Sequence, residues 1–177
     1  MENVRPAFPA LAAKTVVCHT ITYVVCGILA AHFLDYGALF AHPNSGMRQI
    51  TDPWVMAGPL FQPLRGLVFA AVFYPFRGTL FGKKNGWLLM AWMLIGLGIL
   101  NTFAAAPGSI EGMIYRTGLP QYEVIGWLEV MPQALLLSAL LCFWVNRPGQ
   151  KWLNWTLGIS FFVVMVLPVL GLLARKG

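Results

Sequence analysis

Residues 152–173 read WLNWTLGISFFVVMVLPVLGLL and contain no charged side chain. A helix needs roughly 20 apolar residues to cross the hydrocarbon core of a bilayer, so this stretch predicts a membrane-spanning helix. Four further apolar stretches are of similar length, and the predicted spans cover residues 15–34, 60–81, 86–105, 124–145 and 152–173. The sequence therefore predicts an all-α bundle of five transmembrane helices, built as a single membrane domain over residues 1–177.

The composition of the whole chain agrees with this assignment. Of the 177 residues, 58% are hydrophobic and 10% are charged, whereas soluble domains carry about 25% charged residues. So few charges cannot cover a water-facing surface, and so apolar a chain is not disordered, which excludes both classes. The net charge of +6 does not indicate nucleic acid, because the basic residues lie singly or in pairs at the ends of the predicted spans. The expected partner is the lipid bilayer.

The distribution of basic residues also predicts an orientation. Seven Lys and Arg residues lie before the first span or in the second and fourth joins between spans. Four lie in the first and third joins or at the C-terminus, and Arg65 is set aside as intramembrane. Because cytoplasmic segments are enriched in Lys and Arg, we expect the N-terminus in the cytoplasm and the C-terminus outside, in a bacterial inner membrane.

Two joins are longer than the others, at residues 35–59 and 106–123, and the predicted orientation places both on the outer face. Long joins on one face often carry binding residues. In the second of them Ser109 has the chemistry of an N-cap, which predicts a short helix that begins near Ile110.

The second predicted span contains a local repeat. Residues 63–66 read PLRG and residues 75–78 read PFRG, so Arg65 and Arg77 are twelve residues apart. On a helix they would lie roughly 18 Å apart along the axis. The hydrocarbon core is about 30 Å thick, so both guanidinium groups cannot reach the headgroups without tilt, snorkelling or thinning of the bilayer. At least one of the two arginines is therefore expected to have a partner within the protein.

Small residues four apart predict where the helices pack closely. Glycine, alanine and serine let two helix backbones approach each other in a membrane. The predicted packing pairs are Gly27 with Ala31, Gly66 with Ala70, and Ala134 with Ser138.

Polar residues of several spans fall at a similar depth near the outer face. Arg65 and Glu129 are each about five residues, or roughly 7–8 Å of helical rise, from the outer end of their spans. Since they carry opposite charges at matching depth, we predict an Arg65–Glu129 contact between the second and fourth spans. The predicted ligand-binding residues of this polar pocket are His32, Gln62, Arg65, Asn101, Glu111, Glu129 and Gln133.

Two interpretations of this pocket stay open. Ionisable groups inside a membrane are costly to desolvate and are functional candidates by default. The neighbouring Pro63 and Pro132 favour a functional role, because helices interrupted at mid-membrane often line transporter sites. The structural interpretation is an ion pair that sets helix register, an Arg65 that snorkels outward, or a protonated Glu129 packed against a neighbouring helix.

For the function, we expect the binding or passage of a small molecule, or an accessory role beside a membrane-protein partner or a second copy of the chain. The alternative is a membrane hydrolase or transferase that acts on lipid, with Glu129 or His32 as the acid/base group. No metal or cofactor is expected, and the lesser alternative is a metal site formed by His32, Asp35, Glu111 and Glu129, in which His32 and Asp35 share one helical face. The cysteines show no metal-binding spacing, and spans two to five contain no histidine that could ligate a haem opposite His19.

Overall fold

The computed structural model describes residues 5–42, 45–116 and 124–174. Within these ranges every regular element is a helix and no strand is present, which confirms the all-α class. The elements in chain order are α1 (Phe8–Phe33), α2 (Tyr36–Ala41), α3 (Pro53–Met56), the 3₁₀-helix η1 (Gly58–Phe61), α4 (Gln62–Phe73), α5 (Arg77–Leu80), α6 (Gly86–Ile95), the π-helix η2 (Gly96–Leu100), α7 (Ile110–Tyr115), α9 (Trp127–Val145) and α10 (Lys151–Ala174).

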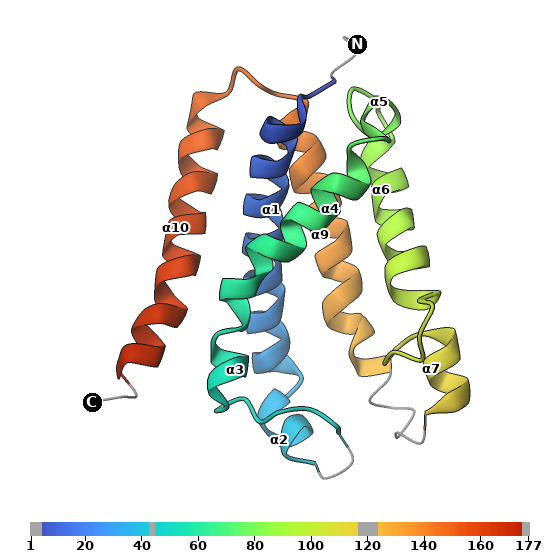
Figure 1. Ribbon diagram of the computed structural model, residues 1–177, viewed down its shortest axis with the longest axis vertical. Helices are drawn as coiled ribbons and strands as arrows, with labels where there is room; N and C mark the ends of the chain where they lie inside the picture. Colours follow the sequence, from blue (N-terminus) through green and yellow to red (C-terminus); the bar gives the residue numbers. More distant parts are fainter. Residues whose placement is uncertain (1–4, 43–44, 117–123, 175–177) are drawn as a thin grey trace.

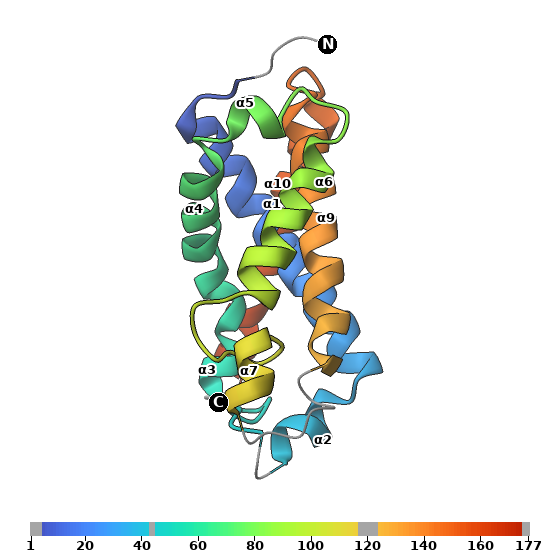
Figure 2. The same ribbon diagram turned by 90° about the vertical axis from the view of Figure 1, so that its right-hand side faces the viewer.

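The first helix is the centre of the bundle. Helix α1 packs against α4, α9 and α10, and α6 packs against α9 (Figure 1). The start of α1, helix α5 and the link from α9 to α10 lie at one end of the bundle, whereas α2, α3 and α7 lie at the other (Figure 1). Figure 2 shows α4 on one side of the bundle and α9 on the other, with α1 running obliquely from the first side to the second. The chain therefore runs back and forth between two ends.

Among the described residues, three helices are long and apolar enough to span a membrane: α1, α9 and α10. They correspond to the predicted spans 15–34, 124–145 and 152–173. Helix α1 begins earlier than predicted, at Phe8, because Pro9 lies in its first turn, where the missing N–H of a proline has no helical partner to lose.

The other two predicted spans are shorter as helices. The apolar helical segments there cover residues 58–73 and 86–100, which corrects the predicted ranges 60–81 and 86–105. Helix α4 ends at Phe73 and the chain turns before α5, since Pro75 has no N–H to continue the helical ladder. Helix α6 changes into the π-helix η2 at Gly96 and Gly98, where glycine weakens α-helical propensity.

The contact between α1 and α4 depends on a glycine. A Cβ on Gly66 would lie 2.7 Å from the Cα of Val16, and Gly66 and Ala70 are both buried. This confirms close packing at this small-residue pair. Ala134 and Ser138 on α9 are likewise buried, whereas the third predicted pair, Gly27 and Ala31, lies on a half-exposed part of α1.

The predicted N-cap is present in the join before α9. The Ser109 hydroxyl accepts a hydrogen bond from the Gly112 N–H at 2.9 Å, and α7 begins at Ile110. The Trp127 indole N–H donates to the Gly108 carbonyl at 2.8 Å and so ties this join to the start of α9. The short helix is thus confirmed.

Helix α10 presents an apolar face outward. Leu153 and Leu157 are its buried residues, whereas Trp155 is 73% exposed and Phe162 is 68% exposed. An apolar face of this size is unfavourable in water. Its chemistry fits the hydrocarbon of a bilayer.

Candidate functional site

A cavity of about 190 Å³ lies between α1, α4, α9 and the junction of α6 with η2. A single water molecule needs roughly 10–15 Å³ of such space, so the cavity has room for a small solute. Its lining includes one imidazole, one guanidinium and one amide among apolar side chains. The lining residues used below are His19, Arg65, Phe69, Gly98, Ile99 and Gln133.

Two hydrogen bonds orient the imidazole of His19. This side chain is 1% exposed, and its Nε2 lies 3.1 Å from the Gln62 Oε1. The Gln62 Nε2 donates to the Gly58 carbonyl at 3.1 Å, which turns the amide oxygen toward the ring. Because the amide oxygen only accepts, Nε2 carries the proton of the neutral imidazole, and Nδ1 keeps a lone pair.

The Nδ1 atom of His19 is buried and has no hydrogen-bond partner among the described residues. Buried polar atoms are nearly always paired, and His19 lines the cavity, so its unpaired Nδ1 is a candidate contact for a ligand or a water. Phe69 also contacts the ring edge-on, with a centroid distance of 4.9 Å. The His19 acceptor is therefore fixed in place.

Arg65 joins this group through the same amide. Its Nη1 donates to the Gln62 Oε1 at 3.3 Å, so one glutamine oxygen accepts from both Arg65 and His19. Arg65 is otherwise exposed and lines the cavity. The guanidinium has five N–H donors and this bond uses one, which leaves donors for a bound anion.

Irregular helix backbone borders the cavity. Gly98 and Ile99 of the π-helix η2 are part of its lining, and Gln133 follows Pro132 inside α9. Single π-helical turns within α-helices are frequent at functional sites. A proline inside a helix leaves a backbone carbonyl without its usual partner.

The predicted Arg65–Glu129 contact is wrong. Arg48–Asp52 is the ion pair that the described residues form, at 3.3 Å, and neither Arg65 nor Glu129 takes part in one. Both α4 and α9 pack on α1 rather than on each other, so equal depth does not bring the two side chains together.

Glu129 belongs to a second, larger hollow. A groove of about 760 Å³ runs along the second half of α1 beside α2, α3 and residues 46–50, and Glu129 lines it from α9. There the Glu129 carboxylate accepts a hydrogen bond from the Tyr36 hydroxyl. Burial, together with this hydrogen bond and the nearby negative charge, raises the pKa of Tyr36, so the phenol stays a donor.

The other predicted residues lie outside both hollows. His32 is exposed at the end of α1 and packs edge-on against Phe33, with ring centroids 5.0 Å apart. Asn101 is exposed after η2, and Glu111 is exposed in the first turn of α7. The two groups considered for acid/base chemistry, Glu129 and His32, thus share no hollow.

Of the predicted set, Arg65 and Gln133 line the cavity, and Gln62 bonds to the cavity residues His19 and Arg65. His19 also lines the cavity, although it is not among the residues predicted for the site from the sequence. Its position in the middle of an apolar run was a signal, because ionisable groups within a span are functional candidates. No group of three or more His, Cys, Asp or Glu side chains with metal-site geometry occurs within the described ranges.

Comparisons with known proteins supply no relative for this chain. No protein-family model, no curated protein and no solved structure matches it.

Proposed function

We propose that the chain crosses a bacterial inner membrane five times with its N-terminus in the cytoplasm. The alternating path through α1, α4, α6, α9 and α10 supports this (Figure 1). The 3₁₀-helix η1 and α4 together rise about 26 Å, close to the thickness of a hydrocarbon core. The bundle end that holds α5 and the α9–α10 link also carries many of the basic residues, namely Arg77, Lys83, Lys84, Arg147 and Lys151, as expected of a cytoplasmic face.

The function that the geometry supports best is the binding of a small oxyanion in the cavity. The observation that carries this proposal is the unpartnered Nδ1 of the buried His19 in a cavity that Arg65 also lines. A guanidinium is suited to the oxygens of a carboxylate, carbonate or phosphate, which it can bind through two parallel N–H donors.

The imidazole narrows the ligand class. With the proton of His19 on Nε2, the free Nδ1 accepts a hydrogen bond and cannot donate one. A ligand that satisfies both groups has a negative charge for Arg65 and an O–H donor for His19. Bicarbonate and dihydrogen phosphate have this combination, whereas nitrate and chloride do not.

The position of the cavity favours passage as well as binding. His19 lies about 17 Å from the start of α1, whose full length is about 39 Å, so the cavity lies near mid-length of the central helix. Transporters bind their substrates near the bilayer midplane beside interrupted helices. The π-helix η2 and Pro132 supply such interruptions here.

Bicarbonate and nitrate form a matched pair of probes, because both are planar monoanions and bicarbonate alone has an O–H group. The protein is purified in maltoside micelles, and the midpoint of thermal unfolding is measured against each salt at constant pH and ionic strength. Bicarbonate is expected to raise the midpoint more than nitrate does, because a ligand that binds the native state stabilises it.

Arg65→Gln is expected to abolish the difference between the two salts. Arg77→Gln is the matched control, since Arg77 occupies the same place in the local repeat but does not line the cavity. Equal effects of bicarbonate and nitrate on the native protein, or an unchanged response of Arg65→Gln, would contradict oxyanion binding. Bicarbonate flux into proteoliposomes then separates passage from binding alone.

A further inference from the structure

The groove beside Glu129 has a chemistry different from that of the cavity. No residue lines both hollows. Four aromatic side chains face the groove from three helices: Tyr23, Tyr36, Phe40 and Trp54. Stacking on a neighbouring ring orients two of them. Tyr36 stacks on Phe40 with ring centroids 4.9 Å apart, and Trp54 stacks on Phe61 with ring centroids 6.1 Å apart. The groove therefore offers aromatic walls of defined orientation.

Glu129 supplies the negative charge of this groove. Its Oε2 accepts the hydrogen bond from Tyr36, and its Oε1 faces α1 at Gly27, where an added Cβ would lie 3.6 Å from it. Within the described part of the chain no Lys, Arg or His forms an ion pair with this carboxylate. Half-buried carboxylates without a cationic partner are costly to keep in apolar surroundings.

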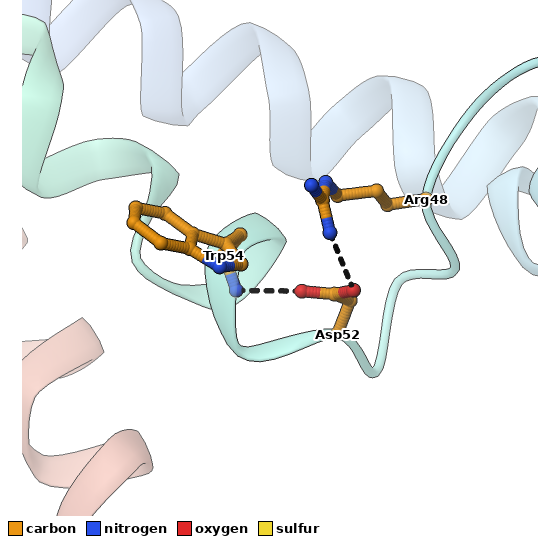
Figure 3. A network of polar contacts seen from close by, with 3 residues as sticks. All are labelled: Arg48, Asp52 and Trp54. Carbon is orange, nitrogen blue, oxygen red and sulfur yellow. Dashed lines mark hydrogen bonds and ion pairs between the residues drawn. The ribbon is translucent and has the colours of Figure 1, made fainter.

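Arg48 does not neutralise the carboxylate, although it lines the same groove. Its Nη1 pairs with the Asp52 Oδ2 at 3.3 Å, and the Asp52 Oδ1 accepts from the Trp54 backbone N–H at 2.8 Å (Figure 3). Asp52 thus balances the charge of Arg48 and also begins the helix that carries Trp54. The net charge of the three ionised groups Arg48, Asp52 and Glu129 is negative.

We propose that this groove binds an organic cation, a tertiary or quaternary ammonium with apolar substituents. The ammonium charge lies at Glu129, and its substituents contact the aromatic walls. Aromatic faces attract cations through their quadrupole, and the attraction grows as the cation leaves water. The apolar remainder of the lining suits the hydrocarbon part of such a ligand, and the volume of about 760 Å³ is typical of small-molecule sites. This site shares no lining residue with the oxyanion cavity.

Benzyltrimethylammonium and neopentylbenzene test the role of the charge without any change to the protein. The two molecules have the same shape, and only the first is charged. Binding of labelled benzyltrimethylammonium to the native protein in maltoside micelles is expected to be saturable. Neopentylbenzene is expected to compete at least tenfold less well than the unlabelled cation. Equal competition would show that the groove takes any apolar molecule, such as a lipid chain, and would overturn the proposal.

Glu129→Gln tests the residue. The glutamine keeps an oxygen that can accept from Tyr36, so the local structure is retained while the charge is lost. Binding of benzyltrimethylammonium is expected to weaken at least tenfold. Glu111→Gln is the matched control, because Glu111 is exposed on α7 and lies outside the groove, and its affinity should equal that of the native protein. Unchanged affinity in Glu129→Gln would also overturn the proposal.

Discussion

Residues 62–66 (QPLRG) and 74–78 (YPFRG) are two copies of one pattern with different surroundings. In both copies the arginine donates to the residue before the proline: Arg65 to the Gln62 side chain at 3.3 Å, and Arg77 to the Tyr74 carbonyl at 2.9 Å. The first copy faces α1 and the cavity, so its glutamine also reaches the buried His19. The pattern thus determines the hydrogen bond between the arginine and the residue before the proline. Packing against a neighbouring helix determines which further contacts each copy makes.

The second copy has no helix packed against it as closely. Arg77 lies over the Tyr74 ring, with its guanidinium carbon 4.0 Å from the ring centroid. A Cβ on Gly78 would meet Arg5 at 3.7 Å, an ordinary contact with a flexible side chain, whereas a Cβ on Gly66 would meet backbone. Equivalent substitutions in the two copies therefore measure what packing against α1 adds.

The largest difference is expected at the glycines. Gly66→Ala forces α4 away from α1, because a Cβ there would lie 2.7 Å from the Val16 Cα. Overpacking of this kind costs about 1–3 kcal/mol, and we expect the upper end of that range in the free energy of unfolding. Gly78→Ala should change it by no more than about 0.5 kcal/mol. Unfolding by SDS titration in mixed micelles measures both values, and equal losses would show that the α1 contact is not what distinguishes the copies.

A smaller difference is expected at the residue before each proline. Gln62→Leu leaves the buried Nε2 of His19 without its partner, and an unsatisfied buried donor costs about 1–3 kcal/mol. Tyr74→Phe keeps the ring under Arg77 and the backbone carbonyl that Arg77 uses. We expect it to be nearly neutral in the same titration. A neutral Gln62→Leu would mean that His19 finds another partner.

The arginines should differ in ligand binding rather than in stability. Arg65→Lys keeps the charge but loses the planar pair of donors. We expect it to weaken bicarbonate binding several-fold in the thermal-shift titration, less than Arg65→Gln does. Arg77→Lys should bind like the native protein. Equal bicarbonate affinities of Arg65→Lys and Arg77→Lys would show that the two arginines do not differ in ligand binding.

The smallest effects are expected at the prolines. Pro63 is the second residue of α4, where backbone N–H groups have no helical acceptor. Pro75 lies in the turn between α4 and α5. Replacing either by alanine should change the free energy of unfolding by about 0.5 kcal/mol or less. Pro75→Ala alone should raise the helical signal in far-ultraviolet circular dichroism, since it restores an N–H.

The lengths of the apolar stretches and the capping residues at helix ends made much of the fold predictable. The predicted spans 124–145 and 152–173 differ from α9 and α10 by a few residues, and Ser109 caps α7 as expected. The breaks within the other two predicted spans, 60–81 and 86–105, were harder to predict from the sequence. Pro75 and the glycines of η2 are visible in the sequence, but each run has enough apolar residues to span a membrane, and this total length outweighed the interruptions.

The candidate site was only partly predictable. The position of a residue in the sequence gives its depth along a predicted span, but it does not give the direction in which the side chain leaves the packed helix. Arg65 and Glu129 have matching depth but lie in different hollows. His19 is positioned by Gln62, which is 43 residues away in the chain. Such a pairing follows from how α4 packs on α1, and no local pattern encodes it.

The central place of α1 bears on the order in which the protein is assembled during synthesis. Helix α1 leaves the ribosome before α4, α9 and α10, so each of these three helices packs against a partner that is already made. Helix α6 differs, since it packs on α9, which is translated later. The cavity is therefore completed only once α9 has arrived, because Gln133 and its neighbours on that helix form part of the lining.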